Sequence, residues 1–273
     1  MSDNHIHEAV RRGQPLREVA TVIDAHTHGG PYHNFWAPGS DAESMVRQMD
    51  RTGVRAMLCA PHIAIGPDAE RGNDLAIAWS RRFPGRIFAY AVPYPHEPQR
   101  VEGELNRAFD AGAVAIKLHP SLHRYNIEGP GYSVAWKVAR ERHTFILTHT
   151  WHGDPFCAPK LFVGMAQEYP DVPIIFGHSG GVPAGFPDAI ALARRYPNLY
   201  LDTCGSYITG LWVKRMVEVV GAERVVFGSD LPFIDSRYCL GKTAMADLSV
   251  DELRQVLGLN TKRLLARAGV GIE

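Results

Sequence analysis

Residues 19–28 read Val-Ala-Thr-Val-Ile-Asp-Ala-His-Thr-His, an apolar run that ends in two histidines and is followed by a loop rich in glycine and proline. A short run of this kind, rich in β-branched residues and bounded by turn residues, predicts a buried β-strand. Seven further runs of the same type follow along the chain. We predict these strands at 55–60, 86–92, 113–120, 143–149, 172–178, 199–202 and 224–230.

Amphipathic segments alternate with these runs. We predict helices at 40–53, 73–82, 98–111, 132–142, 161–169, 187–196, 211–220 and 250–268. Strands that alternate with helices indicate parallel βαβ units, and a doubly wound open sheet would carry a Gly-rich phosphate turn after an early strand. No such turn follows residues 19–28. The sequence therefore predicts the α/β class and a (β/α)8 TIM barrel, a single domain of residues 19–273 after a short N-terminal extension of residues 1–18.

Composition excludes several classes of partner. Among 273 residues, Lys plus Arg and Asp plus Glu both number 29, so the basic excess typical of nucleic-acid binding is missing. The 4 cysteines form no CxxC pair. No apolar run reaches the ~18 residues of a membrane span, and the polar start lacks the apolar core of a signal peptide. We expect a cytoplasmic protein with no nucleic-acid and no membrane partner.

Histidine is abundant, with 13 residues, and its placement is informative. Active sites of (β/α)8 barrels lie at the C-terminal ends of the strands. The predicted strand ends carry His26, His28, His119, His149, His178 and Asp230.

An HxH pair alone is weak evidence, as His5-Ile-His7 in the polar extension illustrates. On a strand, however, His26 and His28 point the same way, about 7 Å apart, so both rings can close on one ion. Asp24 shares their side and is expected to accept the N–H of a ligand ring.

Neutral imidazoles plus a carboxylate suit zinc or a similar divalent ion. Ligands from strands 1, 5 and 8 would leave room for a water or a substrate oxygen, and His178 could stabilise developing charge or shuttle a proton. For substrate contacts we consider Lys117, His119, Trp151 and Arg237, each of which could instead pair locally or be solvated.

Five motifs occur in order at successive strand ends. They are Ile23-Asp-Ala-His26-Thr-His28, Ile116-Lys-Leu-His119-Pro120, Ile146-Leu-Thr-His149, Phe176-Gly-His178-Ser-Gly-Gly181 and Phe227-Gly-Ser-Asp230. Together they resemble the amidohydrolase superfamily, in particular the amidohydrolase-related (amidohydrolase 2) branch of metal-dependent hydrolases and nonoxidative decarboxylases.

The resemblance implies roles for individual residues. It implies that His26, His28, His149 and Asp230 hold one divalent ion, with zinc as the expected metal. It also implies that His178 is catalytic and that Asp230 acts as general base. Some members of the superfamily bridge two metals with a carboxylated lysine on strand 4, and Lys117 leaves this second-metal alternative open.

Three functions follow as hypotheses. The favoured one is a hydrolase that uses a metal-activated water on an amide, ester or lactone of a small organic substrate, with carboxylic compounds as the favoured class. The alternative is nonoxidative decarboxylation of an unsaturated or aromatic acid, which would want a cation such as Arg237 or Lys117 in the pocket. A catalytically inactive barrel used for binding is the third. A homo-oligomer is a further expectation, since barrels of this type often pair.

Overall fold

A computed structural model describes residues 4–272 and shows eight parallel strands that are hydrogen-bonded in the order of the sequence. The strands are β1 (Ile23–Thr27), β2 (Ala56–Cys59), β3 (Ile87–Ala91), β4 (Ala113–Leu118), β5 (Ile146–His149), β6 (Ile174–Gly177), β7 (Leu199–Asp202) and β8 (Val225–Val226). The segment after β8 returns to β1 through a parallel bridge between Thr27 and Leu231 and a hydrogen bond from Asp230 N–H to the His26 carbonyl. The predicted (β/α)8 barrel is confirmed.

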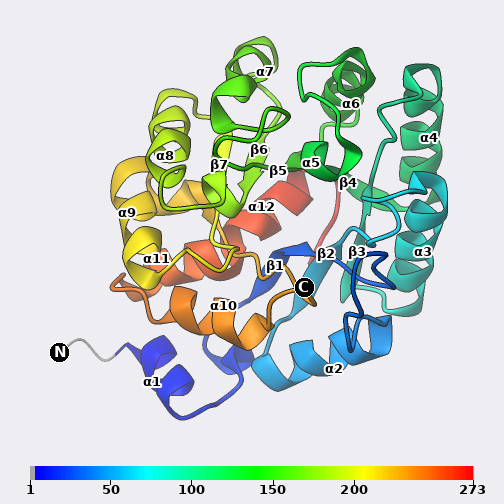
Figure 1. Ribbon diagram of the computed structural model, residues 1–273. Coiled ribbons are helices and arrows are strands. Elements are labelled where there is room, and N and C mark those ends of the chain that lie inside the picture. Colours follow the sequence, from blue (N-terminus) through cyan, green and yellow to red (C-terminus); the bar gives the residue numbers. More distant parts are fainter. Residues whose placement is uncertain (1–3, 273) are drawn as a thin grey trace.

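Helices surround the strands (Figure 1). The outer ring consists of α2 (Ala42–Thr52), α3 (Ala69–Arg82), α4 (Pro98–Ala111), α6 (Pro130–Glu141), α7 (Val163–Glu168), α8 (Phe186–Arg195), α9 (Gly210–Val220) and α12 (Asn260–Arg267). Four further helices are α1 (His5–Arg11), α5 (Pro120–His123), α10 (Ser236–Ala244) and α11 (Val250–Arg254). The segment predicted as one helix at 250–268 is divided between α11 and α12 by a π-helical turn at Gln255–Leu259.

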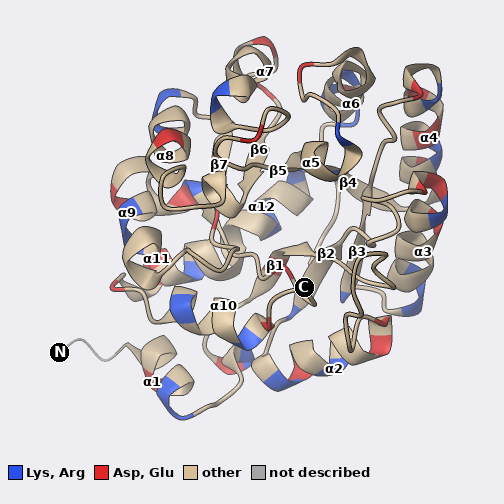
Figure 2. Cartoon of the chain, viewed as in Figure 1, with Lys and Arg blue, Asp and Glu red and all other residues tan. Residues whose placement is uncertain are grey.

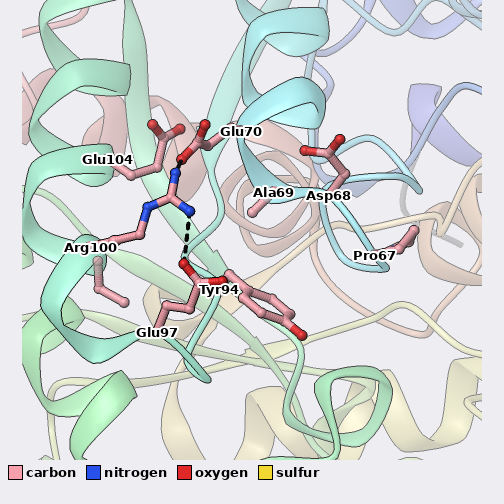
Figure 3. Close-up of a pocket in the computed structure, with 9 residues that line it drawn as sticks. Pro67, Asp68, Ala69, Glu70, Tyr94, Glu97, Arg100 and Glu104 are labelled. Carbon is pink, nitrogen blue, oxygen red and sulfur yellow. Dashed lines mark hydrogen bonds and ion pairs between the residues drawn. The ribbon is translucent and has the colours of Figure 1, made fainter.

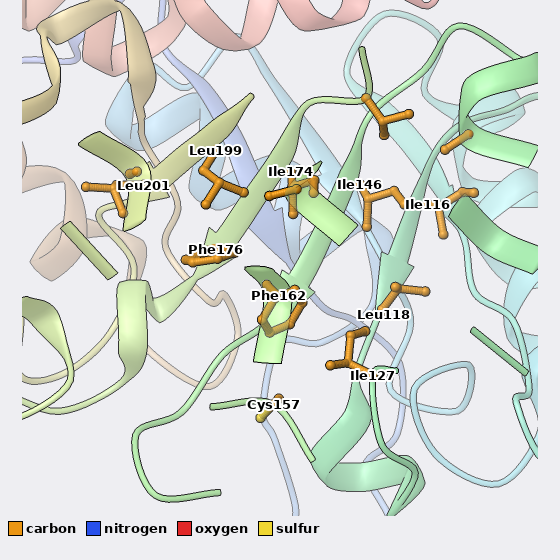
Figure 4. Close-up of a cluster of buried hydrophobic side chains, with 14 of the residues drawn as sticks. Ile116, Leu118, Ile127, Ile146, Cys157, Phe162, Ile174, Phe176, Leu199 and Leu201 are labelled. Atoms are coloured by element: carbon orange, nitrogen blue, oxygen red, sulfur yellow. The ribbon is translucent and has the colours of Figure 1, made fainter. Parts of the chain in front are cut away.

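Side chains of β4 to β7 alternate between two environments. Ile116, Ile146, Ile174 and Leu199 are paired in register and belong to the apolar layer between strands and helices, where Phe162 packs (Figure 4). Because successive residues of a strand point to opposite faces, the next row points into the barrel. That row contains Lys117, Leu147, Ile175 and Tyr200. The alternation therefore aims Lys117 at the axis of the barrel.

Residues 4–18 of the predicted extension pack against the barrel. Ile6 on α1 and Leu16 are almost fully buried, in an apolar cluster that they share with Leu253 and Leu257. Residues 1–3 of the predicted extension, and residue 273 at the end of the predicted domain, lie outside the described residues.

Charged positions of both signs are interspersed along the outer helices (Figure 2). Within residues 4–272, no helix combines the length and the apolar character needed to cross a bilayer.

Candidate active site

His26 and His28, at the end of β1, have the same tautomer. Nδ1 of His26 lies 2.7 Å from the carboxylate of Asp202, and Nδ1 of His28 lies 2.8 Å from the carbonyl oxygen of Ala60. Each Nδ1 therefore carries the proton and donates it, and each Nε2 keeps a lone pair. Burial also holds the pKa of both rings well below the usual value for histidine. Two neutral imidazoles are thus oriented as metal ligands.

Asp230 faces both of these lone pairs. Its Oδ1 lies 3.4 Å from Nε2 of His28 and 3.7 Å from Nε2 of His26. Two ligands that each lie about 2.1 Å from one tetrahedral ion are roughly 3.4 Å apart. The three side chains therefore have the spacing of ligands that share an ion.

Two further histidines adjoin this group: the ring of His178, directly after β6, has its centroid 4.9 Å from that of His26 and 4.8 Å from that of His149, which ends β5. His149 stacks between His119 (ring centroids 4.2 Å apart) and Trp151 (5.8 Å). Its Nδ1 is buried and has no hydrogen-bond partner among residues 4–272, so the protein leaves one ligating atom of this ring unused. The ligand atoms of His26, His178, Cys204 and Asp230 all lie within 4.8 Å of one another, a group that contains two of the four predicted metal ligands and neither His28 nor His149.

The buried carboxylates around the histidines also favour a bound cation. Burial raises the pKa of Asp24, Asp202 and Asp230 to about 7 each. Among the described residues, Lys117 is the one fully buried Lys or Arg. Buried carboxylates are stable only when they are paired or coordinate a metal. A divalent ion would supply the positive charge that Lys117 alone does not, so the donor set fits the metal that the sequence predicted.

Lys117 and His119, both predicted as substrate contacts, differ in position. Nζ of Lys117 lies 2.7 Å from Nε2 of His26, beneath the cluster, and burial lowers the pKa of Lys117 to about 8. Nδ1 of His119 accepts the N–H of Leu122, so the proton of this ring is on Nε2. Lys117 thus contacts a predicted metal ligand, whereas His119 lines the pocket above.

Two catalytic candidates lie just beyond the strands rather than within them. The predicted strands extend to His178 and Asp230, but β6 ends at Gly177 and β8 at Val226. His178 and Asp230 have φ angles of 64° and 65°, in the left-handed region that non-glycine residues seldom adopt. Such backbone conformations persist where the surrounding structure fixes them, and they are concentrated at active sites.

A pocket of about 580 Å³ opens above this cluster. It is lined by His28, Tyr32, Phe35, His119, Ser121, Leu122, His149, Trp151, Asp154, His178, Gly205, Ser206, Tyr207, Asp230, Phe233 and Ile234. The lining joins imidazoles and carboxylates at the base with aromatic rings around the opening. The geometry thus places a candidate metal site at a pocket with an aromatic lining.

The family model named Amidohydrolase matches residues 23–267, nearly the whole chain. The chain belongs to the amidohydrolase family. The protein is therefore an enzyme of this family. The resemblance inferred from the strand-end motifs is confirmed.

Solved structures show the same fold at low identity. The 2,6-dihydroxybenzoate decarboxylase from Rhizobium is 17% identical, with a TM-score of 0.73, 90% of this chain and 99% of that chain covered. An uncharacterized TIM-barrel protein from Bordetella bronchiseptica is 16% identical, with a TM-score of 0.74 and coverage of 92% and 100%. The 5-carboxyvanillate decarboxylase from Novosphingobium aromaticivorans, complexed with manganese and a nitrobenzoic acid, is 14% identical, with a TM-score of 0.73 and coverage of 92% and 97%.

Arg237 lies apart from the rest of the amidohydrolase site. It is on α10, an element that the sequence did not predict, and its side chain is 77% exposed and ion-paired with Asp235. Arg237 is not among the residues that line the pocket. By contrast, Trp151 lies in the pocket, against His149.

Asp202, and not Asp24 as predicted, accepts the N–H of a ligand ring. Asp24 accepts backbone N–H groups of His26 and Ser229, so it fixes the backbone, not a ring. The acceptor for the His26 ring is Asp202, at the end of β7. The sequence indicates only that Asp202, which ends a predicted strand, lies at the mouth of the barrel, and not which ring it contacts.

A second hollow lies outside the barrel, between α3 and α4 (Figure 3). Most of its charged groups are ion-paired: Arg100 binds Glu97 and Glu70, while Glu104 binds Arg107 just outside the lining. None of its lining residues belongs to the histidine cluster. The histidine cluster at the mouth of the barrel, not this hollow, is therefore the candidate active site.

Proposed function

We propose that the protein is a metal-dependent hydrolase that cleaves an amide, ester or lactone bond in a small substrate with a planar, uncharged group. One observation supports this choice over decarboxylation. The described lining of the pocket contains histidines, carboxylates and aromatic rings but no lysine or arginine. A carboxylic acid held for decarboxylation would favour a cationic side chain at its carboxylate, and Arg237 points elsewhere.

His26, His28, His149 and Asp230 would hold the metal, and we propose one ion, zinc or manganese. The ion would act as a Lewis acid that polarises a carbonyl group and lowers the pKa of a water molecule. The tautomers of His26 and His28 and the unpartnered Nδ1 of His149 support these ligands.

The remaining steps are assigned to protein groups. Asp230 is the carboxylate at the base of the pocket, and we assign it as the general base that takes the proton of the attacking water and returns it to the leaving group. His178 lines the same pocket and stabilises the negative charge that develops on the substrate oxygen. Trp151 and Phe233 offer apolar faces to the planar group of the substrate.

The test is a screen of aromatic and aliphatic amides, esters, lactones and carboxylic acids with metal-loaded protein, scored for hydrolysis and for CO₂ in parallel. We expect hydrolysis, with oxygen from labelled water in the product. Asp230→Asn should abolish turnover, whereas Asp251→Asn, at a side chain that is 93% exposed, should not change it. Release of CO₂ without a hydrolytic product would overturn the proposal.

Nonoxidative decarboxylation of an aromatic acid is the second candidate. Two structures of similar fold are decarboxylases of aromatic acids, and one of them contains manganese. Lys117, 2.7 Å from His26, is the buried cation nearest to the cluster and would have to serve the carboxylate. In that case Lys117→Met would abolish CO₂ release, whereas Lys242→Met, whose Nζ binds the Gly205 carbonyl, would keep it.

A barrel that binds without catalysis is tested by metal content. Protein purified without added metal is compared with a His26→Ala/His28→Ala variant by elemental analysis. We expect about one ion per chain, and close to none in the variant. Equal, near-zero contents in both proteins would favour the inactive barrel.

A further inference from the structure

Cys204 is a buried thiol in the site that the sequence did not single out. It lies two residues beyond β7, and its Sγ is 3.3 Å from Nδ1 of His178. Asp202 fixes its backbone, because Oδ1 of Asp202 accepts the N–H of Cys204 at 2.8 Å. The backbone next to His178 is fixed too, since the hydroxyl of the following residue, Ser179, donates to the Asp202 carbonyl. The contact between sulfur and ring is thus built into two adjacent strand ends.

The direction of this hydrogen bond follows from chemistry. A thiol is a weak donor and a weak acceptor, whereas the unprotonated nitrogen of an imidazole is a good acceptor. Among the described residues, Cys204 Sγ has no other acceptor for its hydrogen. If Nδ1 donated instead, the S–H would stay buried without a partner.

We propose that Cys204 donates its S–H to Nδ1 of His178 and thereby holds His178 in the Nε2–H tautomer. His178 then offers the pocket an N–H donor and no lone pair. This is the reverse of His26 and His28, whose Nδ1 atoms donate to Asp202 and Ala60. The hydrogen-bond partners thus give the three neighbouring rings different roles: His26 and His28 are metal ligands, and His178 is a hydrogen-bond donor.

The consequence for the reaction rests on the proposed function. An N–H fixed toward the pocket stabilises negative charge on a substrate oxygen without any change of protonation. It also removes His178 from competition for the metal and leaves the role of base to Asp230. Cys204 is a positioning residue, since it acts on the substrate through His178.

The tautomer can be measured without any substrate. In zinc-loaded protein labelled with ¹⁵N-histidine, long-range ¹H–¹⁵N correlations distinguish a protonated from an unprotonated ring nitrogen, and His178→Asn assigns the signals. We expect Nε2–H for His178 in the wild type and in Cys204→Ser, and a mixture of tautomers in Cys204→Ala. Cys59→Ala, which removes another buried thiol, should leave the His178 signals unchanged.

The thiol gives a second, independent signal. The S–H stretching band of Cys204 should be displaced in the direction of a hydrogen-bonded thiol, and His178→Asn should move it back toward the position of a free thiol. A band that disappears when zinc is added would identify Cys204 as a thiolate ligand and overturn the proposal. An Nδ1–H tautomer in the wild type, or the same tautomer in Cys204→Ala, would overturn it as well.

Kinetics then separates this inference from the proposed function. Loss of this one hydrogen bond should lower kcat by about fivefold in Cys204→Ala with little change in KM, and Cys204→Ser should restore part of it. A tautomer that shifts as expected in a protein that hydrolyses nothing would contradict the proposed function alone. A wild-type kcat in Cys204→Ala would contradict the positioning role.

Discussion

The carboxylate of Asp202 accepts a hydrogen bond from Nδ1 of His26 at 2.7 Å, and both side chains are fully buried. The contact joins the ends of β1 and β7, whose residues are separated by 176 positions in the sequence. It fixes the tautomer of His26 and makes its Nε2 more basic, which is the usual role of a carboxylate behind a metal-bound histidine. A metal held by His26 would therefore depend on Asp202, a residue that would not itself contact the metal.

Asp202→Asn should weaken metal binding by about 10- to 100-fold, because His26 loses its charged acceptor while the shape of the side chain is kept. Competition with a chromogenic chelator measures the affinity. Asp251→Asn, on the exposed face of α11, is the matched control and should bind metal like the wild type. Equal affinities in the two variants would show that Asp202 is not coupled to the metal.

Gly228→Ala should disturb the same pair by steric overlap. A Cβ at this position would lie 2.4 Å from Oδ1 of Asp202 and 2.8 Å from Cβ of His26. Both neighbours are buried, so we expect a loss of about 1–3 kcal/mol in the free energy of unfolding, together with weaker metal binding.

Gly241→Ala is the control for this prediction. Gly241 lies within α10, and a Cβ there would meet nothing within 4 Å, so stability should be unchanged or slightly increased. Urea denaturation of the metal-free proteins measures the difference. If the two variants had the same stability, Gly228 would not be needed to make room for the pair.

Local sequence features were sufficient for most of the fold and for part of the site. The alternation of strands and helices is a property of short segments, and together with the geometry of parallel barrels it predicts that His26, His28 and Asp230 lie together. The ends of elements were less accurate. Residues 227–230 were predicted as strand, but Phe227 donates its N–H to Val256 and Asp230 adopts a left-handed conformation.

The partners of the site residues could not be predicted in the same way. Asp202 and Cys204 belong to no motif, and their roles depend on distances between β7 and its neighbours. The sequence does not predict the position of Arg237 either, since α10 has only a weak amphipathic pattern. Contacts between side chains of different strands are set by packing, which a single sequence does not report.

Lys117→Met distinguishes a site with one ion from a site with two ions, because the two hypotheses predict opposite changes in metal binding. With one ion, the ammonium of Lys117 competes for Nε2 of His26, 2.7 Å away, so its removal should tighten metal binding. With a carboxylated lysine that bridges two ions, its removal should reduce the metal content instead. We expect one ion per chain in the wild type and tighter binding in the variant.

Elemental analysis and chelator competition, with and without bicarbonate, measure both quantities. Bicarbonate should have no effect on the wild type if Lys117 stays an amine. Two ions per chain in the wild type, falling in Lys117→Met and rising with bicarbonate, would establish the carboxylated lysine and contradict the single-ion proposal.

His123, outside the metal cluster, should make stability depend on pH. It is buried at the end of α5, with Nδ1 2.7 Å from the hydroxyl of Tyr132, and burial lowers its pKa to about 4. In the unfolded chain the same ring titrates near 6.5. Between these two values the unfolded chain binds a proton that the folded protein does not, so the free energy of unfolding falls as the pH is lowered.

His123→Gln removes this titration. Because one pH unit of pKa difference corresponds to about 1.4 kcal/mol, His123 should contribute about 3 kcal/mol to the loss of wild-type stability between about pH 6.5 and pH 4, and nothing above that window. Urea denaturation of metal-free wild type and variant at a series of pH values gives the difference directly, since the other histidines titrate equally in both. His5→Gln, at an exposed ring on α1, should keep the wild-type slope. Parallel stability curves for wild type and His123→Gln would mean that the ring of His123 is protonated as easily in the folded protein as in the unfolded chain.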